Sequence, residues 1–165
     1  MTPRFERLTA SDWPRVAHLR VAPDQQRFSG TVREAFDAGE AEVDFHGIFD
    51  GEDAVGFFKI DRGYSKSYGF AAPSDLGLRA FLIDLRHQGK GIGRRACRAL
   101  PAHLAPLYPC AGTLWLTVNV INLPAIRSYR SGGFEDTGEI WPKGAAGPQH
   151  IMRCALSGRL SGDMR

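Results

Sequence analysis

A glycine-rich corner at residues 88–95, Gln-Gly-Lys-Gly-Ile-Gly-Arg-Arg, constrains this 165-residue chain more than any other feature. The apolar run before it, residues 78–83, is typical of a strand that is buried on both faces. After the corner, apolar residues recur at the spacing of one helix face from Ile92 to Leu104. A buried strand that turns through three glycines into an amphipathic helix predicts an α/β fold.

The same corner predicts an anion site. Glycines let the main chain turn tightly and bring its N–H groups close to a ligand. The first N–H groups of a helix have no partner within the helix and carry partial positive charge. Arg94 and Arg95 add formal charge beside them. The expected ligand is a pyrophosphate, and the alternative that stays open at this point is a glycine turn without any ligand.

Two common phosphate-binding loops do not fit this corner. The Walker loop needs four residues between its glycines, followed by Gly-Lys-Ser or Gly-Lys-Thr. The dinucleotide fingerprint GxGxxG, counted from Gly89, would need a glycine where Arg94 stands. The pattern that remains is Q-x-x-G-x-G, formed by Gln88, Gly91 and Gly93.

A second motif follows a predicted strand at residues 113–120. The chain reads NLPAIRSY from residue 122 to residue 129 and reaches a Gly-Phe pair shortly afterwards. Asn122, Ala125 and Tyr129 fall along one face of a helix, about one turn apart. The segment therefore predicts a short helix that presents an amide and a phenol on the same side.

Taken together, the motifs Q-x-x-G-x-G and N-x-x-A-x-x-x-Y…G-F resemble the signature of the GNAT N-acetyltransferase superfamily. Residues 23–38, 80–93 and 133–138 look most like its bacterial spermine/spermidine (diamine) acetyltransferase subgroup. The resemblance implies a single N-acetyltransferase domain over residues 1–165. It also implies an α/β GNAT fold, with a mixed central sheet of six to seven strands and helices on both faces.

By this resemblance, the cosubstrate is acetyl-CoA and no metal takes part. The pantetheine arm is expected along the fourth strand, where the fourth and fifth strands separate, and the pyrophosphate is expected on the glycine corner. The residues expected to hold acetyl-CoA are Leu82, Ile83, Asp84, Gln88, Gly89, Lys90, Gly91, Ile92, Gly93, Arg94 and Asn122.

Tyr129 is the expected catalytic residue, facing the thioester sulfur as the proton source for the leaving thiolate. The main-chain N–H of Leu82 is a candidate for stabilising the oxyanion. The general base stays open. Many members of the superfamily place a glutamate on the fourth strand where this chain has Gly77, so Asp75, Asp84 and water are the alternatives.

The acceptor is expected to be a primary amine of a small molecule, and the subgroup favours a polyamine-like amine. A dication is costly to desolvate without carboxylates, yet Gln149, followed by His150, stands where the subgroup commonly has a glutamate. Amino sugars, peptide or protein amines, and a module that binds acetyl-CoA without turnover stay open. The carboxylates that could compensate are Glu34, Asp37, Glu40, Asp44 and Asp61.

The composition and the charge of the chain exclude several other classes of protein. Hydrophobic residues at 43% and charged residues at 24% are typical of a soluble globular protein. A net charge of +3 is small for a nucleic-acid binder. The start of the chain lacks the apolar stretch of a secretory signal, and the uncharged residues 99–126 contain four prolines, which excludes a membrane helix. Three cysteines without a CxxC pair favour a cytoplasmic location. A homodimer stays open.

The remaining elements follow from periodicity and turn residues. Strands are expected at residues 5–8, 42–49, 54–60, 134–140 and 150–155, and helices at residues 12–19, 32–38 and 123–130. Pro101 is expected to kink the helix after the glycine corner or to make it restart.

Overall fold

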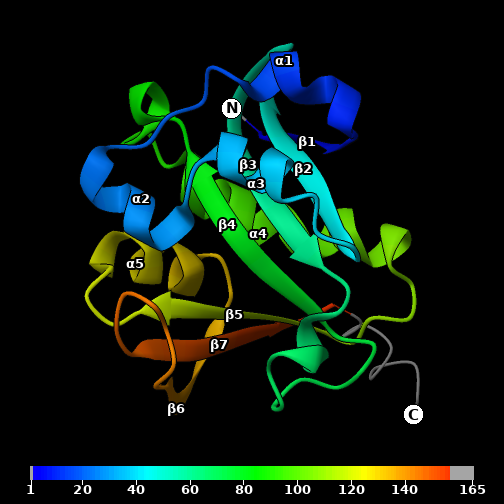
Figure 1. Cartoon of the computed structure of the whole chain (residues 1–165), viewed down its shortest axis with the longest axis vertical. Helices are drawn as coiled ribbons and strands as arrows, with labels where there is room; N and C mark the ends of the chain where they lie inside the picture. Colours follow the sequence, from blue (N-terminus) through cyan, green and yellow to red (C-terminus); the bar gives the residue numbers. More distant parts are fainter. Residues whose placement is uncertain (1, 157–165) are drawn as a thin grey trace.

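One mixed sheet of seven strands, in the order β1-β2-β3-β4-β5-β7-β6, organises the computed structural model, which describes residues 2–156 (Figure 1). Among these residues β4 and β5 run parallel, and every other pair of neighbouring strands is antiparallel. The predicted mixed sheet is therefore confirmed. The strands are β1 Arg4–Leu8, β2 Val43–Asp50, β3 Asp53–Asp61, β4 Leu76–Ile83, β5 Thr113–Asn119, β6 Glu135–Trp141 and β7 Gln149–Ala155.

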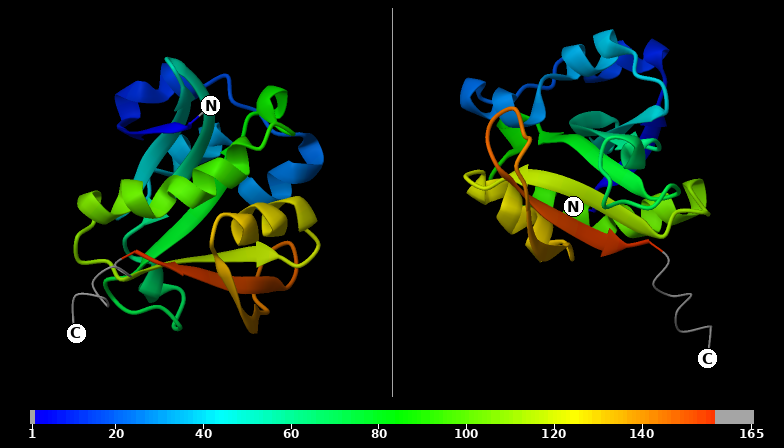
Figure 2. Two further views of the ribbon diagram at one scale, coloured as in Figure 1. Left: turned by 180° about the vertical axis from the view of Figure 1, so that it is seen from behind. Right: turned by 60° about the horizontal axis from the view of Figure 1, so that its bottom comes forward.

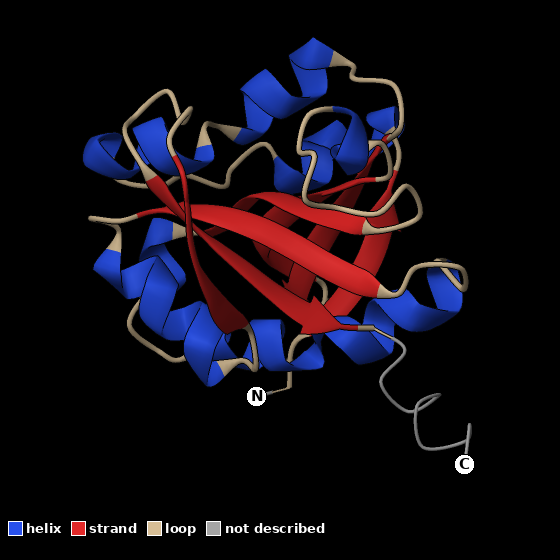
Figure 3. Ribbon diagram, turned by 90° about the horizontal axis from the view of Figure 1, so that it is seen from below, coloured by secondary structure: helices blue, strands red, loops and turns tan. Residues whose placement is uncertain are grey.

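Helices cover both faces of the sheet (Figures 2 and 3). Helices α4 and α5 lie on one face, and α1 and α3 pack on the other. Short 3-10 turns occur at Ala10–Asp12, Tyr64–Lys66 and Leu85–His87. The α-helices are α1 Trp13–Val16, α2 Pro23–Ser29, α3 Val32–Ala38, α4 Ile92–Leu107 and α5 Leu123–Ser131.

Apolar side chains on both faces of the sheet explain the long apolar runs in the sequence. In β3, the neighbouring residues Phe57 and Phe58 are both fully buried and belong to different cores. Phe58 packs in the core that contains the apolar stripe of α4, all of which is buried as its spacing predicts. Each such side chain contributes roughly 1.5–3 kcal/mol to stability. The two cores fix the position of β4 between them.

The helices differ locally from what the sequence predicts. Helix α1 ends at Val16 and does not reach Leu19, because the main chain at Arg20 turns away to donate its N–H to Asp84 Oδ1 at 2.9 Å. Helix α2 was not predicted, because its residues are mostly polar and show little apolar periodicity. Of the two effects expected at Pro101, the restart does not occur: helix α4 continues through this residue, since buried residues on both sides of it hold the helix against the sheet.

Residues 99–126 form the end of α4, strand β5 and the start of α5. Within the part of the chain that the structure describes, none of the helices combines the length and the apolar character that crossing a membrane requires.

A buried histidine ties β2 to α4. His46 has no exposed surface, its Nδ1 lies 2.9 Å from His103 Nε2, and its Nε2 lies 3.1 Å from the Tyr108 hydroxyl. Tyr108 in turn donates to Asp44 Oδ2 at 2.7 Å. This chain of bonds is complete when His46 is neutral, with Nδ1 accepting from His103 and Nε2 donating to Tyr108. A second proton on His46 would meet the His103 N–H.

We therefore expect acid to destabilise the fold through His46. Burial, and to a lesser extent the charge of His103, lowers the pKa of His46 from 6.5 to about 3. Between these values the unfolded chain binds more protons than the folded chain, so this contribution is complete above pH 6.5 and is lost as the pH falls towards 3. The free energy of unfolding, measured by urea denaturation, should fall by about 2 kcal/mol between pH 7 and pH 5. In His46→Gln this slope should become shallower, and the part that remains comes from His103, whose pKa burial also lowers; an equal slope in both proteins would contradict the assignment.

Candidate functional site

The sheet opens where β4 separates from β5. Within the described residues these two strands pair only at Leu76–Leu114 and Gly77–Trp115, and they diverge beyond that point (Figure 1). A bulge in β4, where Ala80 has a φ of +55°, accompanies the opening. The main chain near the end of β4 is therefore free on the β5 side to pair with an extended ligand.

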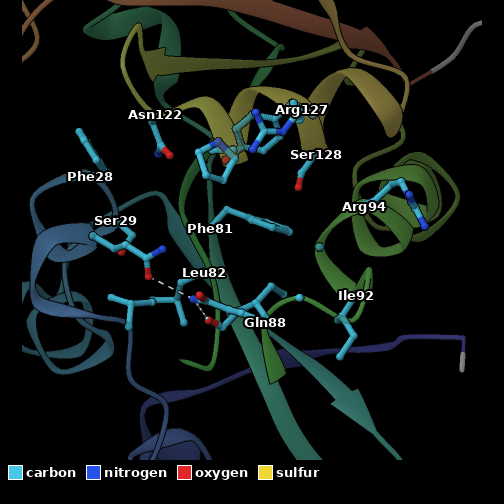
Figure 4. Close-up of a pocket in the computed structure, with 18 of the residues that line it drawn as sticks. Phe28, Ser29, Phe81, Leu82, Gln88, Ile92, Arg94, Asn122, Arg127 and Ser128 are labelled. Atoms are coloured by element: carbon cyan, nitrogen blue, oxygen red, sulfur yellow. Dashed lines mark hydrogen bonds between the residues drawn. The ribbon is translucent and has the colours of Figure 1, made fainter. Parts of the chain in front are cut away.

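A cavity of about 560 Å³ lies at this opening, bordered by β4, α2, α5 and the start of α4 (Figure 4). Its volume is ordinary for a small-molecule site. The sequence-predicted residues that line it are Leu82, Ile83, Gln88, Gly89, Gly91, Ile92, Gly93, Arg94, Asn122 and Tyr129. Asp84 and Lys90 are not in the lining. The amide of Asp84 already donates to Val55 O at 2.8 Å, and Lys90 is exposed.

The glycine corner has the conformation that its composition predicts. Gly89 and Gly91 both have a φ of +78°, which favours glycine, and Gly91 is the residue before the first turn of α4. Gln88 anchors the corner: its Nε2 donates to Ile83 O at 2.9 Å and to Gln25 Oε1 at 3.2 Å (Figure 4). The side chain of Gln88 thus holds the loop in place, and the N–H groups at the start of α4 remain available.

The charges around this first cavity suit an anion. Arg94 and Arg127 line it, and no carboxylate of the described part of the chain does. Arg95 and Arg98, which also lie on α4, instead donate to main-chain oxygens, Lys90 O at 3.1 Å and Ser131 O at 2.8 Å. Two arginines and the first N–H groups of a 16-residue helix therefore converge on one space.

Tyr129 lies on α5 and lines the first cavity. Its ring packs edge-on against Phe81 and Phe134, with centroids 5.9 and 5.6 Å away. The ring is 9% exposed, and its hydroxyl makes no hydrogen bond to any residue that the structure describes. Burial raises the pKa of Tyr129 above its ordinary value. The phenol is therefore protonated and free to donate to a ligand.

A second cavity of about 440 Å³ meets the first one at Tyr129. It extends between β3, β4, β5 and the loop that joins β6 to β7. A reacting group held at the junction would therefore be accessible from both sides, with one cavity for each of two substrates. The residues that line both cavities are Phe28, Ser29, Phe81, Asn122, Ala125 and Tyr129.

The two candidate bases lie outside both cavities and hold the fold together. Asp75 Oδ2 accepts from Trp115 Nε1 at 2.8 Å and from the Ala72 N–H at 2.9 Å. Asp84 is 1% exposed and accepts from Arg86 Nε at 2.9 Å, besides the Arg20 amide. Neither carboxylate is positioned to take a proton at the junction, so water is the alternative that the geometry favours.

Gly77 has no room for the glutamate that the superfamily often carries there. The ring of Tyr64 packs directly over it, and a Cβ at residue 77 would lie 1.9 Å from Tyr64 Cδ1. Tyr64 lines the second cavity from this position. The tyrosine therefore occupies the space that a side chain on β4 would need.

The carboxylates considered for a cationic acceptor are all outside the lining of the second cavity. Glu34 accepts from the Thr31 N–H at 2.8 Å and caps α3, where Asp37 is exposed. Asp44 binds Tyr108, as described above, and also two arginines. Glu40 and Asp61 bind cationic side chains of the cavity wall. Gln149 lines the cavity, whereas His150 does not.

Several lining residues were not predicted from the sequence. Arg127 and Ser128 lie on α5 between the motif positions, and Gln25 and Ser29 lie on the unpredicted helix α2. For α2, the available signal is Pro23 in its first turn and Gly30 directly after its end. Arg127 and Ser128 could not be found from the motif spacing, because the cavity extends around the helix beyond the face that holds Asn122 and Tyr129.

The glycine corner, the opening between β4 and β5 and the position of Tyr129 together define the class of protein. The sequence profile of the acetyltransferase (GNAT) family matches residues 4–134, most of the chain, and the chain belongs to this family. The match includes the glycine corner, Tyr129 and the whole of the opening between β4 and β5.

Among individual relatives, the spermine/spermidine N(1)-acetyltransferase of Bacillus subtilis (strain 168) is 44% identical over 63 residues. That match covers 38% of this chain and only 41% of the relative's length. The uncharacterized N-acetyltransferase YbbJ of the same organism is 26% identical over 128 residues, which cover 76% of this chain and 80% of YbbJ.

Solved structures show the same fold at low identity. The aminoglycoside acetyltransferase AAC(6')-Ib, in complex with coenzyme A, superimposes with a TM-score of 0.76 and 19% identity, over 96% of this chain and 99% of that one. The spermidine N-acetyltransferase from Vibrio cholerae, in complex with coenzyme A and spermine, gives a TM-score of 0.69 and 15% identity, over 96% and 98%.

Proposed function

We propose that this protein is an acetyl-CoA-dependent N-acetyltransferase that acetylates a primary amine of a small molecule. The observation that carries the proposal is that the two cavities meet at Tyr129, whose hydroxyl makes no hydrogen bond to the residues that the structure describes. Family membership supports it, as do the names of the relatives and the coenzyme A in two structural neighbours. The reaction uses direct attack by the amine while both substrates are bound.

Acetyl-CoA occupies the first cavity in this proposal. Its diphosphate binds the N–H groups of Ile92, Gly93 and Arg94, and the guanidinium groups of Arg94 and Arg127 supply the opposite charge. The pantetheine arm extends along β4 at Leu82 and Ile83, next to Asn122. This orientation brings the thioester to the junction, because the first cavity extends from the glycine corner to Tyr129.

At the junction, the free amine attacks the thioester carbonyl carbon, the new N–C bond forms and the C–S bond breaks. An alkylammonium group has an ordinary pKa near 10.4, so it must first lose a proton, which leaves through water in the second cavity. Tyr129 donates a hydrogen bond or a proton to the departing sulfur, and the second proton, which the nitrogen loses as it becomes an amide, balances the proton gained by the thiol. The N–H of Leu82 is proposed to bind the oxyanion.

The compartment and the assembly are proposals too. Cys97, Cys110 and Cys154 are all free thiols, which suits a reducing, cytoplasmic location. A homodimer and the absence of a metal from the reaction stay predictions.

Two measurements on one sample test the proposal. Acetyl-CoA at 100 times its Kd should stabilise the protein by about 2.7 kcal/mol and raise its Tm by roughly 5–11 °C. Addition of an amine should then release the coenzyme A thiol, followed with a thiol reagent. A raised Tm without thiol release from any amine would favour a module that binds acetyl-CoA without turnover. An unchanged Tm would contradict the proposal at its first step.

A further inference from the structure

The second cavity is lined by cations. The four cationic side chains are Lys59 on β3, Arg79 on β4, Arg27 on α2 and Lys143 in the loop between β6 and β7. That loop and the end of α2 border the same cavity. Among residues 2–156, none of those that line it is an aspartate or a glutamate. A cavity wall of this kind attracts anions and repels cations.

Two of these cations are already neutralised. Lys59 Nζ lies 2.8 Å from Glu40 Oε1, and Arg79 Nη1 lies 2.9 Å from Glu40 Oε2 and 3.2 Å from Asp61 Oδ2. Burial opposes ionisation of Glu40, but the hydrogen bonds from Lys59 and Arg79 hold its pKa below the ordinary value. Glu40 is therefore ionised. Both Glu40 and Asp61 are already bound to cationic side chains, so a cationic substrate would have to compete for them with the protein's own side chains.

The other two cations have no such partner. Within the part of the chain that the structure describes, neither Arg27 nor Lys143 has a carboxylate within 4.0 Å. Each lies near an aromatic ring instead, 4.6 Å from the ring centre of Phe28 for Arg27 and 5.5 Å from that of Trp141 for Lys143. They give the cavity a surplus of positive charge, and Gln149 contributes a neutral amide where a carboxylate would balance it.

We infer that the acceptor amine also carries an anionic group, a carboxylate or a phosphate, and that Arg27 and Lys143 bind this group in the second cavity. The inference rests on the proposed function, because it assigns the second cavity to the acceptor. The anion pairs with the two unpartnered cations, and the amine at the other end of the molecule reaches the thioester beside Tyr129. A polyamine, in contrast, would place a second positive charge against them.

A panel of amines with one chain length tests this inference. The compounds are 1,5-diaminopentane, pentylamine, 5-aminopentanoate and 4-aminobutyl phosphate, and the readout is kcat/KM from thiol release. We expect one of the two anionic amines to exceed pentylamine by about 10-fold or more, and diaminopentane to be the slowest. Comparison of the carboxylate with the phosphate identifies which anion the cavity prefers. Diaminopentane or pentylamine as the best substrate would overturn the inference and leave the proposed function intact.

Substitutions of Lys143 and Arg27 test whether these two residues cause the preference for an anionic amine. Lys143→Glu should lower the ratio of kcat/KM for the anionic amine to that for diaminopentane by about 100-fold, since it replaces an attraction with a repulsion. Arg27→Gln should lower the ratio by about 10-fold. Lys66→Gln is the matched control, because Lys66 is an exposed lysine outside both cavities, and its ratio should equal that of the wild type. An unchanged ratio in Lys143→Glu would overturn the inference. Thiol release with none of the four amines would overturn the proposed function and this inference with it.

Discussion

Replacement of Tyr129 by phenylalanine should lower kcat by about 10²–10⁴-fold while the Kd for acetyl-CoA stays nearly the same. The substitution removes one oxygen atom and keeps the ring, which packs edge-on against Phe81 and Phe134. Because the Tyr129 hydroxyl makes no hydrogen bond within the described residues, its loss leaves no protein group unpaired. The effect should therefore appear in turnover and not in stability.

The raised pKa of Tyr129 specifies how the hydroxyl acts. Transfer of a proton from a phenol with a pKa near 10 to the thiolate of a thiol with a pKa near 8.5 costs about 2 kcal/mol of free energy. Burial raises the pKa of Tyr129 and makes complete transfer harder still. Stabilisation of the developing thiolate by a hydrogen bond in the transition state is then the main contribution.

The measurement is steady-state turnover of acetyl-CoA with a saturating amine, together with calorimetric titration of acetyl-CoA. Tyr108→Phe is the matched control, since Tyr108 lies outside both cavities and binds Asp44 on β2. Its kcat should equal that of the wild type below its Tm. An unchanged kcat in Tyr129→Phe would remove this residue from the mechanism.

Replacement of Gly93 by aspartate should weaken acetyl-CoA binding by about 100-fold or more. A Cβ at residue 93 would lie 3.6 Å from both Ile83 Cγ1 and Ser128 Oγ, which is ordinary contact, so the side chain fits. An aspartate in the first turn of α4 also suits the partial positive charge of the helix N-terminus. The fold should therefore survive, while the new carboxylate neutralises Arg94 and repels the diphosphate.

Calorimetric titration of acetyl-CoA into Gly93→Asp and Gly93→Ala separates charge from bulk. The alanine variant adds the same Cβ without a charge and should lose less than about 10-fold in affinity. Thermal unfolding without ligand should show both variants folded. Equal affinities of the aspartate variant and the wild type would mean that no anion binds at this corner.

The central part of the fold could be predicted because its signals are local. The glycine corner combines a buried strand, positive φ angles and an amphipathic helix within a few residues of each other, and the structure follows that reading. The short helix with Asn122 and Tyr129 is equally local. Helix α2 was missed because its position depends on contacts with β4, far away in the sequence, and not on its own apolar pattern.

The acceptor side could not be read from the sequence, because its charges depend on pairing between distant residues. From the sequence alone, Glu40 and Asp61 are candidates for binding a cation, but in the folded chain Lys59 and Arg79 lie beside them. Gly77 likewise shows only that a glutamate is missing. The ring of Tyr64 fills the space over Gly77 that a glutamate side chain would need, and this contact exists only in the folded chain.

A crystal structure of the protein with coenzyme A bound tests the central claim most directly. The account predicts diphosphate oxygens at about 2.7–3.2 Å from the main-chain nitrogens of Ile92, Gly93 and Arg94. It also predicts the sulfur atom next to the hydroxyl of Tyr129. A diphosphate bound elsewhere, with the corner between β4 and α4 in contact with solvent alone, would contradict it.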